Sequence, residues 1–291
     1  MTKVPGLTPQ QKADFHKDGF LFPLDVFEEE ETYALRDAVL HHLAVSTERG
    51  GPIAALASGP KIHLLWTWAD LLVRHPRLLE IARSVVGPDI LVWGTSVFVK
   101  EPQGDTDLAW HQDALTYDLD GDGQAAAFRV WLALTPTTVN NGTMRFAAGT
   151  HRQGILVHHR ASHLRGRMRG DEASFAEQGF DQHHVLLNPG QCSLHNMLVV
   201  HGSGINRTDE PRVTFAIDYL ATSVRPKDGK PDSALLVSGT DKYGHFAHEK
   251  PPEGDMDESA QKEFHEAALL RMRRLVTAAA EKKEAGLLVK S

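Results

Sequence analysis

The chain of 291 residues has very little cysteine and no long apolar run. Its one cysteine, Cys192, can form neither an internal disulfide nor a cysteine-rich zinc site. No segment approaches the roughly 18 apolar residues that a membrane span requires. The start, MTKVPGLTPQQKADF, lacks the apolar core of a signal peptide. We therefore expect a cytoplasmic protein that is neither exported nor inserted into a membrane.

Positive charge is also scarce, because 31 Lys and Arg residues face 38 Asp and Glu residues and the formal net charge is -7. Binding to nucleic acid depends on clustered cations that neutralise phosphates, so we expect no nucleic-acid partner. Hydrophobic residues make up 41% of the chain, which is typical of a globular protein. A chain of this length can bury one substantial core, and we expect one domain over residues 1–291. Nothing in the sequence indicates an oligomeric state.

The part from about 8 to 87 has helical patterning. Thr8 is suited to cap the N-terminus of a helix, Pro9 is suited to its first position, and Gly19 is suited to end it. The sequence predicts a loop near 51–61 and helices at three places: between Thr8 and Gly19, over Glu28–Val45, and over Trp68–Val86.

The pattern changes from about 90 to 222, where short β-type runs alternate with turn-rich segments. The predicted strands are Ile90–Lys100, Phe128–Leu134, Thr143–Ala147, Val185–Leu187, Cys192–Val200 and Val213–Thr222. Strands without intervening helices favour an antiparallel sandwich or barrel with the helices flanking it.

Three further segments surround this β region. Arg152–His184 is long and polar, which suggests that it folds over something or carries recognition. The C-terminal part, about 223–291, begins as a loop in which we expect no second metal site at His245 and His248. It continues with a packing helix over Ser259–Lys283.

Two groups able to bind metal lie two residues apart in WHQDALTYDL, at His111 and Asp113. On an extended strand, residues i and i+2 project to the same side, so both side chains can reach one point. The best third ligand is His201, at the end of the apolar run SLHNMLVV. Two histidines and one carboxylate are typical of non-haem Fe(II) oxygenases, and a zinc hydrolase is the alternative.

An arginine favours iron over zinc. Arg212 begins the run RVTFAIDYL, and pairing of that run with SLHNMLVV would direct its guanidinium into the barrel. A buried arginine needs an anion, and its fork of donors suits the carboxylate of a 2-oxo acid. Ser203 could supply a hydroxyl that binds the same carboxylate as Arg212. His195 is an alternative third ligand, because strand alternation places it on the same side as His201.

The segments that carry this pattern resemble the phytanoyl-CoA dioxygenase family of Fe(II)/2-oxoglutarate oxygenases. They are HQD at 111–113, VWLALTPTTVNNGTMRFAAGTHRQG and HGSGINRTDEPR, in this order and spacing. The opening LTPQQKADFHKDGFLF and the segment GPDILVWGTSVFVKEP are similar too, so the resemblance covers most of residues 7–222. It implies a mainly β fold with flanking helices around a double-stranded β-helix, also called a jelly roll or cupin-like core.

The resemblance also implies site roles. Fe(II) would be bound by His111, Asp113 and His201, and the 2-oxoglutarate cosubstrate by Arg212, Ser203, Trp131 and Ser96. Trp131 is equally typical of an ordinary core. Related halogenases carry Ala or Gly at the carboxylate position, so Asp113 favours oxygenation over halogenation.

The activity implied is hydroxylation of an unactivated C–H bond of a small molecule, with O2 as oxidant and release of succinate and CO2. The substrate class could be a natural product, an amino acid, a phosphonate or an acyl compound. The alternatives are desaturation, epoxidation or ring formation at the same metal, a metal-retaining jelly-roll binding protein, or a zinc hydrolase. The basic segment 158–169 is either a solvated loop or a contact for an anionic substrate, through Arg160, Arg165, Arg167 or Arg169.

Overall fold

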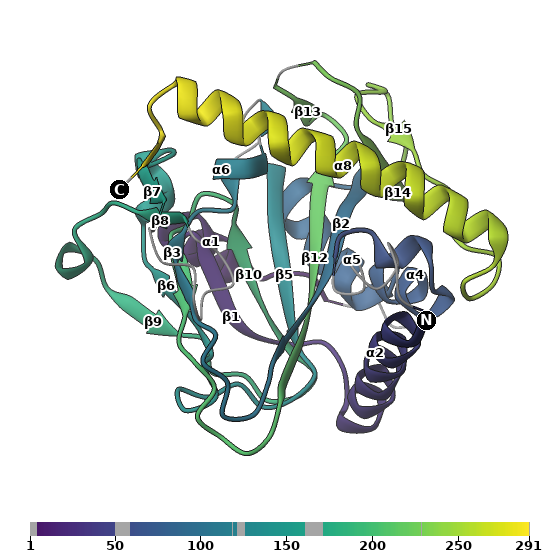
Figure 1. Cartoon of the computed structure of the whole chain (residues 1–291), viewed down its shortest axis with the longest axis horizontal. Helices are drawn as coiled ribbons and strands as arrows, with labels where there is room; N and C mark the ends of the chain where they lie inside the picture. The colour runs from purple at the N-terminus through teal and green to yellow at the C-terminus, as the bar shows by residue number, and fades with distance from the viewer. Residues whose placement is uncertain are drawn as a thin grey trace.

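Two β-sheets form the centre of the computed structural model (Figure 1). The structure describes residues 5–49, 59–117, 119–120, 126–160, 171–227 and 229–290. In the larger sheet the strand order is β1 (Phe20–Asp25), β10 (Gln191–Asn196), β5 (Ala127–Ala133), β12 (Arg212–Ala221), β2 (Ile90–Lys100), β14 (Ser233–Ser238) and β15 (Ala247–His248). In the smaller sheet it is β3 (Leu108–His111), β11 (His201–Ser203), β6 (Met144–Ala147) and β9 (Gln182–His184). These facing sheets confirm the predicted jelly roll.

Strand β12, in the middle of the larger sheet, is buried along its whole length. Because side chains alternate between the two faces of a strand, each face has its own partners. Val213, Phe215 and Ile217 belong to the apolar cluster that includes the helices. Ala216 belongs to a second cluster, which contains Phe146 of the smaller sheet. The even-numbered residues of β12 therefore face the interior between the sheets, where the site lies.

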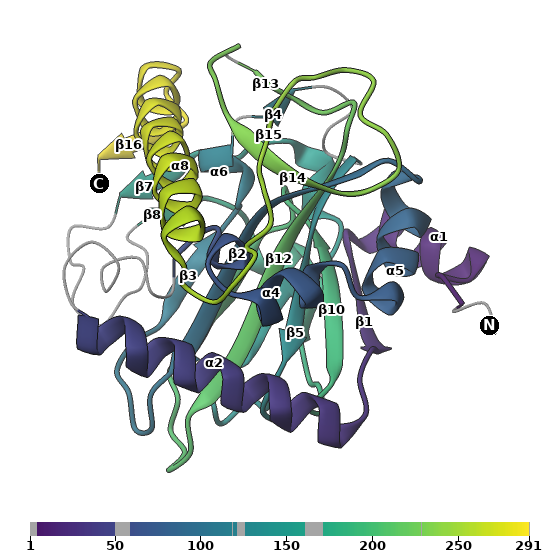
Figure 2. The ribbon, with the colours of Figure 1, turned by 90° about the vertical axis from the view of Figure 1, so that its right-hand side faces the viewer.

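Helices cover the outer face of the larger sheet (Figure 2). The helices of the described residues are α1 (Pro9–Asp18), α2 (Glu29–Arg49), α4 (Thr67–Val73), α5 (Pro76–Val86), α6 (Ala114–Tyr117) and α8 (Glu258–Glu284), with 3-10 turns at Ile62–Leu64, Thr150–Gln153 and Glu177–Gly179. The Thr8 cap and the Gly19 stop of α1 are confirmed. None of these helices is long and apolar enough to cross a membrane.

The prediction of one helix over Trp68–Val86 was wrong. Two helices, α4 and α5, occupy this stretch. Pro76 begins the second helix, and the preceding residue, His75, has an extended ψ of 130°. A proline disfavours helical geometry in the residue before it, so the chain turns between the two helices.

Two predicted strands were also displaced. The run Cys192–Val200 is not one strand, because β10 ends at Asn196 and a turn leads to β11. The Asn196 side chain accepts a hydrogen bond from the backbone N–H of Leu198 at 2.8 Å, which stabilises that turn. The strand predicted over Val185–Leu187 was also wrong, because the strand here is β9, Gln182–His184, which ends just before that run. Cys192–Val200 is buried throughout, and in the other run Val185 and Leu187 are buried while Leu186 is exposed, so apolar composition did not identify the extended residues.

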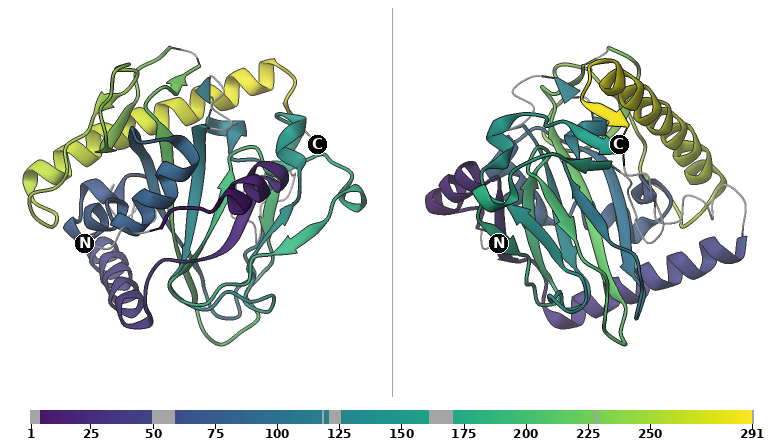
Figure 3. Two further views of the ribbon diagram at one scale, coloured as in Figure 1. Left: turned by 180° about the vertical axis from the view of Figure 1, so that it is seen from behind. Right: turned by 60° about the vertical axis from the view of Figure 1, so that its left-hand side comes forward.

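The C-terminal part crosses one end of the barrel and ends in a separate three-stranded sheet (Figures 1 and 3). Helix α8 is followed by β16 (Leu288–Lys290), which pairs with β7 (His158–Arg160), and β7 pairs with β8 (Asp171–Ala173). The short strands β13 (Arg225–Pro226) and β4 (Leu119–Asp120) form a separate pair. The polar segment 152–184 thus contains strands. The predicted loop near 51–61 falls mostly outside the described residues.

A buried ion pair connects the N-terminal helical part to the C-terminal part. Lys61 pairs with Glu249 and donates to the backbone carbonyl of Ser233 at 2.7 Å. The Ser233 hydroxyl donates to Glu249 at 2.7 Å, and the His63 ring lies 3.5 Å from the same carboxylate. Burial alone would raise the pKa of Glu249, but Lys61 and His63 lower it from 4.5 to about 2.

We expect the Glu249→Gln variant to lose about 3–5 kcal/mol of unfolding free energy at pH 6, because Lys61 is left buried without its counter-charge. The folded-state pKa of Glu249 lies below its unfolded value. Its contribution is therefore complete above pH of about 4.5 and is lost as the pH falls towards 2. Urea denaturation at pH 6, 4 and 3 should show a shallower pH dependence for the variant. Glu253→Gln, at an exposed position, serves as the control, and equal pH dependence in all three proteins would contradict the expectation.

Candidate metal and cosubstrate site

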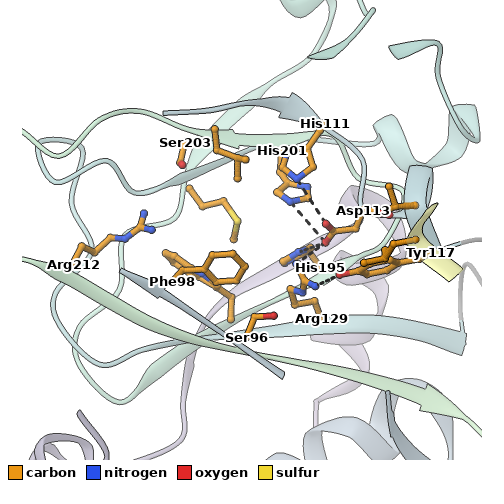
Figure 4. A pocket seen from close by; sticks show the side chains of 15 residues that line it. Ser96, Phe98, His111, Asp113, Tyr117, Arg129, His195, His201, Ser203 and Arg212 are labelled. Atoms are coloured by element: carbon orange, nitrogen blue, oxygen red, sulfur yellow. Dashed lines mark hydrogen bonds and ion pairs between the residues drawn. The ribbon is translucent and has the colours of Figure 1, made fainter. Parts of the chain in front are cut away.

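Three of the residues selected from the sequence meet inside the barrel. His111, Asp113 and His201 are buried, and each offers one ligand atom within 4.8 Å of the other two. Among the described residues, this is the one group of its kind. Nε2 of His111 lies 3.7 Å from one oxygen of Asp113, and Nε2 of His201 lies 3.9 Å from the other. Figure 4 shows the three side chains converging from different elements.

Strand pairing brings the two histidines together, since His201 lies directly opposite His111 in the antiparallel pair of β11 and β3. Each ring places Nδ1 against a backbone carbonyl two residues earlier. For His111 this is Ala109 O at 2.8 Å, and for His201 it is Val199 O at 3.0 Å. A proton on Nδ1 leaves the lone pair on Nε2, which is the arrangement that metal-binding histidines adopt. Burial lowers the pKa of His201 to about 3, with a further contribution from His111, so this ring is neutral at pH 7.

Asp113 lies in the turn before α6, just beyond the end of β3 at His111 and thus on the extension of that strand. Its neighbour Gln112 fixes this turn. The amide of Gln112 donates to Gly154 O at 2.8 Å and Leu198 O at 2.6 Å, and its oxygen accepts from the N–H of Leu156 at 2.8 Å. The residue between the two candidate ligands thus holds the metal-facing loop against two other segments.

A buried arginine contacts the same carboxylate. Nη1 of Arg129 lies 2.9 Å from Asp113 Oδ2, and Nε of Arg129 lies 2.8 Å from Asp218. Burial by itself would raise the pKa of Asp113, but Arg129 and the neighbouring histidines hold it well below its ordinary value. Asp113 is therefore a carboxylate at neutral pH.

Arg212 lies at the other end of the same cavity, with Ser203 near it (Figure 4). It is buried, donates to the backbone carbonyl of Gly142, and lies 5.3 Å from the centroid of the Trp131 ring. No hydrogen bond reaches its Nε from the described residues. Burial lowers the pKa of Arg212 to about 9, so it remains a cation at pH 7. This end of the cavity fits an anion.

The predicted strand partner of Arg212 was wrong, although its direction into the barrel is confirmed. β12 pairs with β2 and β5, whereas His201 lies in the smaller sheet. Ser96 and Trp131 both lie opposite Ala216, four positions along β12 from Arg212. All four predicted cosubstrate residues line one cavity of about 380 Å³, and Ser96 lies opposite Ala216, between the positions of Arg212 and Asp218 on β12.

His195, the alternative third ligand, also lines this cavity. Its Nε2 lies 3.6 Å from Asp113 Oδ2, and its ring centroid lies 4.9 Å from that of His201. It is fully buried, and no hydrogen bond reaches either ring nitrogen from the described residues. It does not belong to the group of three that could share one ion. The geometry thus favours His201 over His195.

Sequence reasoning missed several lining residues, including Arg129, Tyr117 and Leu275. Tyr117 is in WHQDALTYDL itself and accepts a hydrogen bond from Arg129. Arg129 could have been found, because it is a charge within the apolar run FRVWLAL at even spacing from Trp131. Leu275 lies on the helix that the sequence suggested for packing only.

Two other predictions are affected by what the structure describes. Arg165, Arg167 and Arg169 lie outside the described residues, and of Arg160 only the backbone in β7 is described. His248 pairs with Asp241 at 2.9 Å, and Glu249 is part of the buried network with Lys61. Neither of these residues belongs to a metal-binding group among the described residues.

Comparison with known proteins agrees with this geometry. The sequence model of the family described as "Phytanoyl-CoA dioxygenase (PhyH)" matches residues 15–214. The chain belongs to the phytanoyl-CoA dioxygenase family. A solved structure of the non-heme monooxygenase ThoJ in its apo form is 41% identical, with a TM-score of 0.85 over 93% of this chain and 99% of that one. The structure of CytC3 with Fe(II) and alpha-ketoglutarate is 23% identical, with a TM-score of 0.64, over 88% of this chain and 97% of that one, and supports the fold.

Two curated relatives are more distant. "Ectoine dioxygenase" of Sphingopyxis alaskensis is 25% identical over 75% of this chain and 78% of that protein. A "probable alpha-ketoglutarate-dependent hypophosphite dioxygenase" of Stutzerimonas stutzeri is 28% identical over 61% of this chain, and the match spans only 63% of the relative's length. As a phytanoyl-CoA dioxygenase family member, the protein is an Fe(II)/2-oxoglutarate-dependent dioxygenase that uses O2.

We expect His111→Ala to weaken Co(II) binding by more than about a hundredfold, because loss of a ligand should exceed the roughly 10–100-fold effect of losing an outer partner. Co(II) is a convenient probe because it does not oxidise readily, and calorimetric titration measures its affinity. His183→Ala, which removes an exposed histidine of β9, should bind Co(II) as the wild type does. Equal binding by His111→Ala would show that the metal is held elsewhere.

Proposed function

We propose that this dioxygenase is a hydroxylase that binds iron through His111, Asp113 and His201 and inserts oxygen into a C–H bond of a small molecule. The observation that carries the proposal is the convergence of two imidazoles and one carboxylate in a buried cavity, where Arg212 has no anion partner among the described residues. The similarity to a protein described as a non-heme monooxygenase supports it. Three ligands on one face of an octahedron leave three positions open.

Bound Fe(II) supplies the oxidising chemistry: O2 and 2-oxoglutarate are consumed, one oxygen atom enters the C–H bond, and the other enters succinate as CO2 is lost. The residues of the chain determine where this happens. His111 and His201 present Nε2 because their Nδ1 atoms face backbone carbonyls. Asp113 stays ionised because the positive charge of Arg129 stabilises the carboxylate. The carboxylate at position 113 also occupies the place that a halide would need, which favours hydroxylation.

Arg212 and Ser203 are proposed to bind the distal carboxylate of 2-oxoglutarate. A guanidinium without an anion partner in a buried position gains most from a charge-assisted hydrogen bond. Trp131 lies beside Arg212 and limits the access of water to that end. Apolar side chains of Phe98, Met144 and Leu108 line the remaining wall. The substrate enters at the opposite end, where Tyr117 and Leu275 line the cavity. Ser96 lies between the two ends and can contact either compound.

Anaerobic addition of Fe(II) and 2-oxoglutarate should produce a weak visible charge-transfer absorption, because the 2-oxo acid chelates the metal. Zn(II) in place of Fe(II) should give none. Admission of air should then release succinate and CO2 in equal amounts, measured by chromatography and gas analysis. Absence of the absorption together with absence of succinate would remove the proposal and leave a zinc enzyme or a binding protein.

Arg212→Ala should raise the 2-oxoglutarate concentration required for half-maximal succinate release by about two to three orders of magnitude. The loss of a charge-assisted contact that leaves a carboxylate unpaired costs about 3–4 kcal/mol. Arg207→Ala, in the exposed turn before β12, is the matched control and should leave the requirement unchanged. The same requirement in the wild type and in Arg212→Ala would place the carboxylate site elsewhere.

A further inference from the structure

A row of buried polar residues crosses the interior face of the larger sheet beside the metal-binding group. In the strand register, His195 of β10 lies opposite Arg129 of β5, Arg129 lies opposite Asp218 of β12, and Asp218 lies opposite Gly94 of β2. A Cβ atom at Gly94 would lie 3.2 Å from Asp218 and 3.8 Å from Arg271 of α8. The glycine therefore leaves room for these two charged side chains.

Arg129 is the centre of this row, and each nitrogen of its guanidinium has a partner. Nη1 contacts Asp113 Oδ2 at 2.9 Å, Nε contacts Asp218 at 2.8 Å, and Nη2 contacts both Asp218 at 3.1 Å and the Tyr117 hydroxyl. Burial opposes the charged form, but the two carboxylates raise the pKa of Arg129 well above its ordinary value. The side chain is thus a fixed cation with little freedom to turn.

The contact with Asp113 is asymmetric. Oδ2 faces Arg129 at 2.9 Å and lies 3.6 Å from His195 and 3.9 Å from His201, whereas Oδ1 is the oxygen nearer His111, at 3.7 Å. The ion pair with Arg129 thus fixes how the plane of the carboxylate lies between the two candidate histidine ligands.

We propose that Arg129 is a positioning residue that fixes the orientation of the Asp113 carboxylate towards the metal. This inference rests on the proposed function, in which Asp113 is a ligand. Asp218 positions Arg129 in turn by accepting two of its donors. On the other side of Asp218, Arg271 lies 3.7 Å from the carboxylate and stacks 3.3 Å from the centroid of the Trp93 ring. Arrangement of the metal ligand therefore depends on residues of β5, β12 and α8.

The test compares Co(II) binding by the wild type, Arg129→Gln and Arg129→Lys. Removal of a nearby positive charge would by itself strengthen the binding of a cation, but it would also raise the pKa of Asp113, which Arg129 lowers. Binding is therefore measured at pH 7 and pH 8, and weaker binding by Arg129→Gln that is the same at both reflects lost orientation rather than protonation of Asp113. We expect its dissociation constant to rise by about 10–100-fold, the usual effect of losing an outer partner of a ligand. The visible absorption of bound Co(II) should also change, because this spectrum reports the number and arrangement of ligand atoms. The dissociation constant of Arg129→Lys, which keeps the charge, should lie between those of the wild type and Arg129→Gln.

Arg274→Gln is the matched control, because Arg274 is also buried and pairs with an aspartate, Asp232, at 3.1 Å. It should lower the melting temperature without changing Co(II) affinity or absorption. If Arg129→Gln does not fold, Arg129→Lys alone decides by the same two measurements. Wild-type or tighter affinity with an unchanged spectrum in the folded variant would overturn the inference.

Asp113→Ala separates this result from a failure of the proposed function. If Asp113→Ala loses Co(II) and the Arg129 variants do not, Asp113 is a ligand and only the positioning role is wrong. If Asp113→Ala binds Co(II) with wild-type affinity and an unchanged spectrum, the ligand assignment itself is wrong.

Discussion

Charge buried between the two sheets must be neutralised, and this requirement governs the arrangement of the site. Asp113, Arg129 and Asp218 satisfy it among themselves, and Arg271 adds a second cation from α8. Arg212 has no such partner among the described residues. A barrel interior of low dielectric makes unpaired charge expensive, so the carboxylate compound proposed to bind beside Arg212 would lower the cost of burying this cation.

The fold was predictable where local rules act alone. The Thr8 cap and Gly19 stop define α1, and the limits of β2 match the predicted Ile90–Lys100. Prediction failed where a buried turn and a buried strand have the same kind of amino-acid composition. The run from Cys192 to Val200 is buried throughout and mostly apolar, yet the Asn196 side chain turns the chain in its middle. Apolar composition reports that residues are buried and says little about whether they are strand or turn.

At the site, the sequence was informative about residue types and less so about their neighbours. The spacing of His111 and Asp113 indicated a shared target, and the buried triad has this arrangement. Pairing of β11 with β3 could not be deduced, because it joins segments far apart in the chain. Arg129 and Asp218 lie opposite each other on neighbouring strands, and each is a lone charge in an apolar run. Such a charge signals an interior partner, but only the strand register identifies which one.

Leu275 shows that the cavity wall includes a residue from the C-terminal part of the chain. The shared family region ends at residue 214, while this leucine lies beyond it on α8 and still forms part of the cavity wall. Substitution at Leu275 can therefore reshape the cavity without altering His111, Asp113 or His201. Because Arg271 of the same helix lies 3.7 Å from Asp218, changes elsewhere in α8 would reach the residues that hold Arg129.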